Sequence, residues 1–181
     1  RPENIADFSG RIYKEANRLG NLVADIIQLS RLDEQQDAVV SMESVELDEL
    51  AKDVVNNLRD HAEKKNISLD YCGIPINIQG VRHVLYEMLY NIADNAVRYT
   101  NPGGHIHIYV GRKGDRPFYR VEDDGIGIPK SEQKRIFERF YRVDKSHSRQ
   151  TGGTGLGLSI VKHGATLHHA QINVDSDLGK G

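Results

Sequence analysis

Cysteine, long apolar runs and clusters of one charge are all scarce in this sequence. Its 181 residues include one cysteine, Cys72, which excludes an internal disulfide and a Cys-x-x-Cys metal motif and favours a reducing compartment. No apolar run approaches the roughly 20 residues that a membrane-spanning helix needs, and no signal-peptide core follows the charged residues 1–4. The formal net charge is −2 without a long run of lysine or arginine, which argues against nucleic acid or an anionic membrane as the main partner.

The N-terminal residues have the pattern of a coiled-coil helix. Apolar side chains recur every seven residues at two core positions, occupied by Ile5, Ile12, Leu19 and Ile26 and by Phe8, Leu22 and Leu29. Such a stripe needs a partner, either a second helix of a hairpin or a second chain. We therefore expect residues 1–34 to belong to a helical unit and the polar residues 35–44 to be a linker.

The remaining residues, 45–181, predict one compact α+β domain. Alternation or helical spacing of apolar residues predicts strands over residues 45–47, 67–71, 74–78, 105–110, 118–122 and 171–175, and helices over residues 48–65, 81–99 and 155–167. Strands joined by hairpin connections favour a two-layer α/β sandwich over a doubly wound parallel sheet. The expected fold is a mixed sheet packed on three helices, preceded by the long coiled-coil-type helix.

The helix over residues 81–99 carries a polar stripe beside its apolar face. Glu87, Asn91 and Asn95 follow one another at four-residue intervals, and Arg98 and Tyr99 lie one turn further on. Two asparagines one turn apart can offer amide oxygens to a hard cation such as the Mg²⁺ of a nucleotide. Taken alone, such a stripe is more often a solvated helix face.

Two glycine-containing segments follow. Asp123 ends a strand and begins a D-x-G-x-G turn in which glycines let the backbone approach a flat ligand, while the carboxylate can accept a hydrogen bond from an exocyclic amine. Residues 152–157 form a glycine-rich loop directly before the last helix, where backbone N–H groups can bind an anion. This loop matches neither a Walker loop nor the G-x-G-x-x-G spacing. Each segment alone is a weak signal.

Histidines are also present in pairs. His105 and His107 share one face of a predicted strand, and His168 and His169 are adjacent. Without cysteine or carboxylates at ligand spacing, ordinary surface or hydrogen-bonded histidines are the better interpretation, and a structural zinc site is the weaker one.

The order of these motifs along the chain is more specific for one protein family than any single motif is. An asparagine helix, the D-x-G-x-G turn, the Phe-rich residues 136–144 and the G-T-G-L-G-L loop together resemble the catalytic domain of sensor histidine kinases. These kinases belong to the ATPase superfamily that also includes gyrase-type topoisomerases, mismatch-repair ATPases and large chaperones. Residues 8–32 resemble the second helix of the family's dimerisation and phosphoacceptor hairpin.

The resemblance implies a site for ATP and Mg²⁺. It makes Asn95 the metal ligand, Asn91 and Arg142 catalytic groups beside the phosphates, and Asp123 the reader of adenine. The residues that it places around the nucleotide are Asn91, Asn95, Arg98, Tyr99, Asp123, Gly125, Gly127, Ile128, Tyr141, Gly153, Thr154, Gly155, Leu156, Gly157 and Leu158. Residues 130–152 are the expected lid, anchored by Phe137 and Phe140.

The implied activity is transfer of the γ-phosphoryl group of ATP to a histidine on a hairpin of the same or a partner chain. From there the group passes to a response regulator. The resemblance also implies a homodimeric full-length protein, a cytoplasmic location for this domain and an inner or plasma membrane location for the whole sensor.

The chain departs from the family at several points. The phosphoacceptor motif, His-Glu/Asp followed by Leu-Arg-x-Pro, does not occur in it, and Gly164 and the pair His169-Ala170 are unusual residues in and after the last helix. Two rival functions remain open. A degenerate regulatory module or response-regulator phosphatase would bind nucleotide without phosphorylating histidine. An ATP-hydrolysing machine would need a glutamate where Asn91 stands.

Overall fold

The computed structural model describes residues 8–13, 15–16, 19–20, 23–24, 26–27, 30, 41–143 and 154–179. Its elements follow in the order β1 (Glu43–Glu46), α2 (Leu47–Lys64), β2 (Ser68–Gly73), β3 (Asn77–Gly80), α3 (Arg82–Tyr99), β4 (His105–Lys113), β5 (Arg116–Asp123) and α5 (Gly157–Leu167). The predicted α+β class is confirmed. Within the described part of the chain, no helix is both long and apolar enough to span a membrane.

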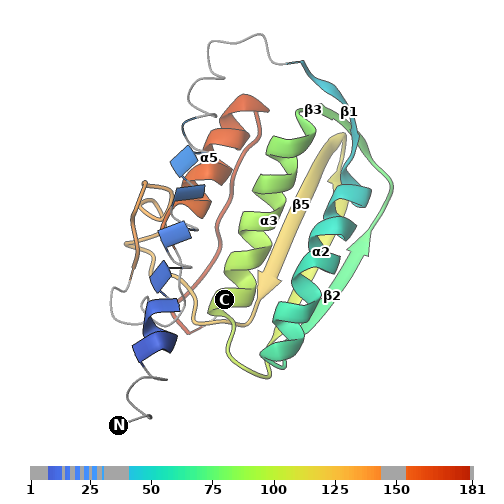
Figure 1. The fold of residues 1–181 in the computed structure, drawn as a ribbon. Helices are drawn as coiled ribbons and strands as arrows, with labels where there is room; N and C mark the ends of the chain where they lie inside the picture. Colours follow the sequence, from blue (N-terminus) through green and yellow to red (C-terminus); the bar gives the residue numbers. More distant parts are fainter. Residues whose placement is uncertain are drawn as a thin grey trace.

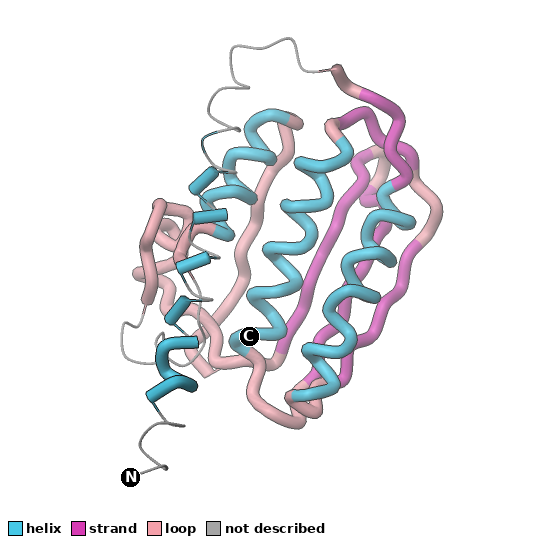
Figure 2. The backbone as a smooth tube through the Cα atoms, in the orientation of Figure 1, coloured by secondary structure: helices cyan, strands magenta, loops and turns pink. Residues whose placement is uncertain are grey.

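The strands form two sheets. β1 and β3 pair antiparallel, and β4 lies between its parallel partner β2 and its antiparallel partner β5. The β4–β5 hairpin closes between Lys113 and Arg116, with Gly114 at a φ of +62° in the two-residue turn, a conformation that favours glycine. α2 and α3 lie over one face of the three-stranded sheet, and α5 packs beside α3 (Figures 1 and 2). The predicted two layers and mixed sheet are therefore present.

The core lies between the helices and the inner face of the sheet. Alternation along β4 directs Ile106 and Ile108 inward, where both are fully buried. The helical repeat of α3 buries Val84, Leu85, Met88, Leu89, Ala93, Ala96 and Val97 against them. Complete burial of one large apolar side chain contributes roughly 1.5–3 kcal/mol. This packing fixes the direction of α3 and therefore the place of its polar stripe.

Gly164 lets α5 approach α3 closely. A β-carbon at this position would lie 2.5 Å from the Met88 sulfur atom and 3.0 Å from a methyl group of Val84. A helical glycine costs roughly 1 kcal/mol relative to alanine, but a side chain here would push the two helices apart. The unusual glycine is therefore explained by helix packing.

Two histidines directly follow α5. The His168 Nδ1–H group donates to the Gly164 carbonyl at 2.7 Å, and the Val81 N–H group donates to His168 Nε2 at 3.0 Å, so this ring joins the end of α5 to the start of α3. His169 has a φ of +52° in the left-handed region, where helices often end with glycine.

One predicted strand is wrong and another is displaced. Residues 171–175 form no strand, and Ser176 and Gly179 instead hydrogen-bond to residues 126–128. Alternating apolar residues are insufficient to form a strand without a paired edge. The strand expected over residues 74–78 lies at Asn77–Gly80, because β1 pairs with that stretch.

The predicted N-terminal helix is described only in part. Residues 8–13 and the described positions from 15 to 30 have helical backbone. The side chains of Phe8 and Ile12 are 66% and 54% exposed, and Leu19 and Ile26 are also exposed. Ile5, Leu22, Leu29 and the continuity of the helix lie outside the described residues. The helix and its partner remain predictions.

Candidate functional site

The polar stripe of α3 is half-buried at the edge of the core. The Asn91 side-chain NH₂ group donates to the Glu87 carbonyl at 2.8 Å, which leaves the Asn91 amide oxygen as the atom available to a ligand. Asn95 is also half-buried, one helical turn further on. Oxygen atoms at this spacing suit a hard cation, as the sequence predicts.

The start of α5 lies directly against this stripe. A β-carbon on Gly157 would lie 2.5 Å from the Asn91 amide oxygen, closer than real β-carbons approach another atom. Leu156 just before it is fully buried. The glycine at 157 therefore allows the N-terminus of α5, with its unpaired backbone N–H groups, to lie beside an amide oxygen of α3.

The glycine loop before α5 is also held on its other side. The Phe140 N–H group donates to the Gly155 carbonyl at 2.9 Å, and a β-carbon on Gly155 would lie 3.0 Å from the Phe140 carbonyl carbon. Gly155 has a φ of +77°, which favours glycine. The Leu156 N–H group donates to the Thr154 hydroxyl at 3.3 Å. Leu158 lies in the first turn of α5 and is half-buried, and Gly153 lies outside the described residues.

The D-x-G-x-G turn packs on the C-terminal end of α3. Gly125 is buried, and a β-carbon there would lie 2.7 Å from the Tyr99 carbonyl oxygen. The Ile126 N–H group donates to the same carbonyl at 3.3 Å. The turn and the glycine loop thus contact the C-terminal half of one helix, although more than 25 residues separate them along the chain.

The two carboxylates of the turn are held differently. Asp123 is half-buried and accepts the Gly125 N–H group at 3.0 Å, and burial raises the pKa of its carboxyl group. Asp124 is exposed and accepts both the backbone N–H and the ring Nδ1–H of His105, which lower its pKa. No described residue bonds to the second oxygen of Asp123, so this partly desolvated oxygen is an acceptor open to a ligand.

Residues near the C-terminus fix the outer side of the turn. The Ile128 N–H group donates to the Ser176 hydroxyl at 2.8 Å, and the Gln133 side chain donates to the carbonyls of both residues. Gly127 has a φ of +69°. Neither Ser176 nor Gln133 was predicted from the sequence, because neither lies in a motif and no spacing connects them.

The Phe-rich segment is anchored differently from the prediction. Ile136 is 8% exposed, whereas Phe140 is 57% exposed and Phe137 is half-buried. The Tyr141 hydroxyl donates to Glu132, and the Arg135 guanidinium group lies 4.2 Å from the centre of the Tyr141 ring. An aliphatic side chain is therefore the buried anchor. Residues 144–152 of the expected lid lie outside the described residues.

The two basic residues predicted for the site, Arg98 and Arg142, lie on different elements. The Arg98 Nε atom donates to Asp94 at 2.5 Å along α3. Arg142 is half-buried at the end of the described part of the Phe-rich segment. Both residues thus lie on the elements that the sequence assigned to them, and their contacts with a nucleotide remain predictions.

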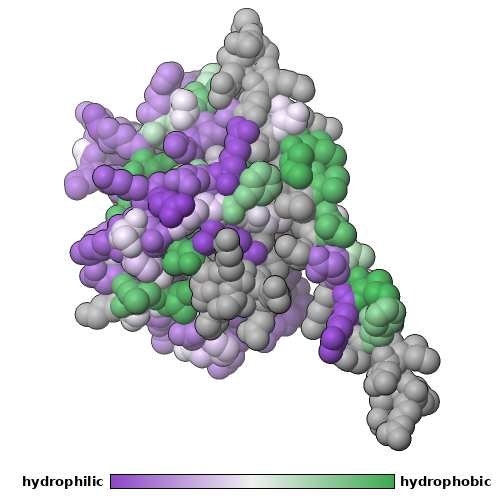
Figure 3. All heavy atoms as spheres, turned by 90° about the vertical axis from the view of Figure 1, so that its left-hand side faces the viewer, coloured by the Kyte–Doolittle hydropathy of each residue, from purple (hydrophilic) through white to green (hydrophobic). Residues whose placement is uncertain are grey.

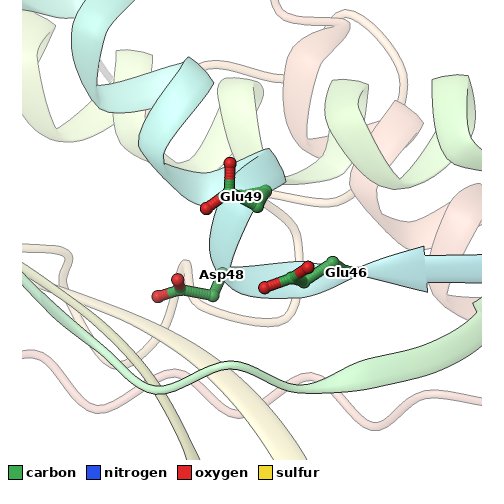
Figure 4. A group of neighbouring side chains, drawn as sticks. All are labelled: Glu46, Asp48 and Glu49. Atoms are coloured by element: carbon green, nitrogen blue, oxygen red, sulfur yellow. The ribbon is translucent and has the colours of Figure 1, made fainter.

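A separate acidic group lies at the junction of β1 and α2. It consists of Glu46, Asp48 and Glu49 (Figure 4). One carboxylate oxygen of each lies within 4.8 Å of the others. Asp48 is 2% exposed, and it accepts the Tyr71 hydroxyl at 2.5 Å and pairs with Lys52 at 2.7 Å. These contacts satisfy the buried carboxylate without a metal ion.

The face that bears α5 and the segment after β5 is mostly hydrophilic, with hydrophobic residues in separate smaller groups (Figure 3). A charged ligand is compatible with such a surface.

Comparison with known proteins identifies the family. Residues 80–181 match the family described as "Histidine kinase-, DNA gyrase B-, and HSP90-like ATPase", and these residues include every box described above. The chain belongs to this family. The resemblance predicted from the sequence is confirmed, and the matched residues include α3, β4, β5 and α5.

Individual relatives extend the match toward the N-terminus. The sensor-like histidine kinase SenX3 of Mycobacterium tuberculosis is 38% identical over 181 residues, which cover 99% of this chain and 44% of that protein. The phosphate regulon sensor protein PhoR of Pseudomonas aeruginosa is 34% identical over 99% of this chain and 42% of that protein. This chain spans less than half the length of these relatives.

Solved structures agree with the fold. The mycobacterial sensor histidine kinase MprB has a TM-score of 0.61 at 28% identity and covers 71% of this chain and 80% of that one. Full-length ShkA, solved in complex with AMPPNP, has a TM-score of 0.74 at 28% identity and covers 90% of this chain and 34% of that one. The α+β arrangement is therefore that of histidine kinase catalytic domains.

Proposed function

We propose that this chain binds Mg-ATP between α3, the D-x-G-x-G turn and the glycine loop. The observation that carries the proposal is the double close approach to α3, with Gly157 against Asn91 and Gly125 against Tyr99. These contacts hold a phosphate-type loop and a partly buried carboxylate along the same half of one helix. The match to ShkA, which was solved with the adenine nucleotide AMPPNP, supports the same ligand.

Each end of the site suits one part of ATP. Asp123 accepts the exocyclic amine of adenine through its second carboxylate oxygen, and Gly125 and Gly127 lie beneath the base. Tyr99, Ile128 and Tyr141 line the nucleotide. At the other end, the glycine loop and the start of α5 bind the phosphates through residues Gly153, Thr154, Gly155, Leu156, Gly157 and Leu158, with Arg98 nearby.

The metal end uses amide oxygens. Asn91 offers its oxygen because its NH₂ group is engaged by Glu87, and Asn95 is the proposed Mg²⁺ ligand one turn further on. When bound, Mg²⁺ neutralises part of the phosphate charge. Asn91 and Arg142 orient and stabilise the γ-phosphoryl group, so catalysis consists mainly of positioning and charge neutralisation.

The acceptor is a histidine on a helical hairpin of the same or a partner chain, and a response regulator receives the phosphoryl group next. The relatives named as sensor histidine kinases support this reaction. We assign residues 1–34 to the second helix of that hairpin, residues 35–44 to a linker and residues 45–181 to the catalytic domain. The exposed apolar side chains at positions 8, 12, 19 and 26 suit a homodimeric hairpin. The domain would be cytoplasmic in a membrane-bound sensor.

Binding and transfer can be tested separately. Asn95→Ala is expected to abolish the Mg²⁺ dependence of ATP binding measured by calorimetry with and without a chelator. If the variant and the parent respond equally to Mg²⁺, the metal assignment is wrong.

For transfer, radiolabelled ATP is incubated with this chain and with a separate hairpin that carries the His-Glu/Asp phosphoacceptor motif. Acid-labile label is expected on the hairpin and not on this chain alone. Transfer in trans should be slow, because tethering normally provides millimolar effective concentrations. ATP binding without any label on the hairpin would favour a regulatory module.

A further inference from the structure

Two histidines of β4 lie on the face of the sheet opposite the helices. Ile106 and Ile108 point inward and are fully buried, so His105 and His107 point outward. Their side chains are 61% and 46% exposed. Two strand residues on one face are separated by about 6.6 Å along the strand, which is close enough for two imidazole rings to reach one ion.

Each of these histidines has a carboxylate beside the same ring nitrogen, within hydrogen-bond distance for His105 and at ion-pair distance for His107. The His105 Nδ1 atom lies 2.9 Å from Asp124, which also accepts the His105 backbone N–H group at 2.8 Å. The His107 Nδ1 atom lies 3.6 Å from Asp70, which stands opposite His107 in the parallel β2–β4 register. The two carboxylates come from different parts of the chain, so the spacing of residues in the sequence did not reveal their pairing with the histidines.

This arrangement favours Nε2 as the metal-binding nitrogen of each ring. A carboxylate at Nδ1 retains the proton there and directs the lone pair of a neutral imidazole to Nε2. Metal-binding histidines usually have such a carboxylate behind them. No described residue bonds to the Nε2 atom of His105 or of His107. The proposed ATP site uses neither ring.

We propose that His105 and His107 bind a transition-metal dication of the zinc class through their Nε2 atoms. Asp124 orients the His105 ring by its hydrogen bond, Asp70 lies beside the Nδ1 atom of His107, and water completes the coordination. Imidazole ligands favour zinc, copper or nickel over Mg²⁺, so this site differs in chemistry from the amide oxygens of α3. Glu122 stands opposite His107 in the β4–β5 register and pairs with Arg120 at 3.3 Å.

The test is a calorimetric titration of chelator-treated chain with zinc chloride, without nucleotide and in excess Mg²⁺. One saturable equivalent is expected for the parent. His105→Gln and His107→Gln should each weaken zinc binding at least ten-fold, and Asp124→Asn about 10- to 100-fold. The matched controls are His61→Gln and His83→Gln, which change exposed histidines on α2 and α3.

The controls should keep the parental zinc affinity, and all five variants should keep the parental thermal midpoint without metal within a few degrees. Absence of saturable zinc binding by the parent would overturn the proposal. Retention of affinity by either strand variant, or equal losses in the helix controls, would do the same.

Discussion

Gly157 offers a sharp test of the contact between the glycine loop and α3. An alanine here would place its β-carbon 2.5 Å from the Asn91 amide oxygen, 3.3 Å from the amide carbon and 3.7 Å from the Asn91 β-carbon. The Asn91 side chain cannot simply turn away, because its NH₂ group is bonded to the Glu87 carbonyl. Gly157→Ala should therefore displace the amide oxygen that we assign to the nucleotide.

The magnitude follows from two opposing effects. Overpacking costs about 1–3 kcal/mol, while alanine in place of glycine in a helix gains about 0.5–1 kcal/mol. The net loss of stability is about 0–2.5 kcal/mol. Each kcal/mol lowers the thermal midpoint of a domain of this size by about 3–5 °C. Loss of a positioned ligand-binding group should weaken ATP binding about ten-fold, equivalent to 1.4 kcal/mol.

Gly164→Ala is the matched control on the same helix. The atoms nearest to its β-carbon would be those of Met88 and Val84 in the core, at 2.5 Å and 3.0 Å, and not the amide oxygen of Asn91. Thermal unfolding and Mg-ATP calorimetry of both variants separate packing from binding. Both substitutions should alter stability, but only Gly157→Ala should weaken ATP binding. Equal affinity losses in the two variants, or parental affinity in Gly157→Ala, would refute the assignment.

Three further predictions concern stability. Hydrogen bonding with Lys52 lowers the pKa of Asp48, so ionised Asp48 stabilises the fold above its ordinary value of 3.8 and this contribution is lost as the pH falls through the lowered value. Denaturant midpoints measured below pH 4 should therefore fall more steeply in the parent than in Asp48→Asn. His169→Gly should raise the free energy of unfolding by about 1 kcal/mol, because glycine tolerates the φ of +52°, and a loss of stability in urea titration would contradict this. His168→Ala should lower it by about 1–3 kcal/mol, since the Val81 N–H group loses its acceptor, and unchanged urea midpoints would show that water replaces the ring.

The local pattern of apolar residues was sufficient to predict most of the fold. The helical repeat over residues 81–99 predicted α3 to within one residue, because its apolar face is the one that the core buries. The strand predicted over residues 171–175 failed because a strand needs a paired edge, and the residues after it, Ser176 and Gly179, bond instead to the turn at residues 126–128. Pairing between distant segments is not encoded in local alternation.

The motifs of the site could be predicted from the sequence, but the contacts between them could not. The glycines at 125 and 157 were visible in the sequence, but the reason for each, a close approach to Tyr99 and to Asn91, required the packing of α3. Ser176, which fixes the turn, has no sequence signal because its role depends on a contact across 48 residues. Ile136 was overlooked because the adjacent phenylalanines are more conspicuous, although the smaller side chain is the buried one.

Calorimetric titration of Asp123→Asn and Asp124→Asn with Mg-ATP tests the central assignment most directly. The two carboxylates are adjacent, but burial raises the pKa of the first, whereas the second is exposed and bound to His105. A hydrogen bond to a charged group contributes about 1.5–3 kcal/mol, so Asp123→Asn should weaken ATP binding by about ten-fold or more and Asp124→Asn should leave it unchanged. Parental affinity in Asp123→Asn, or equal losses in both variants, would contradict the proposed adenine site.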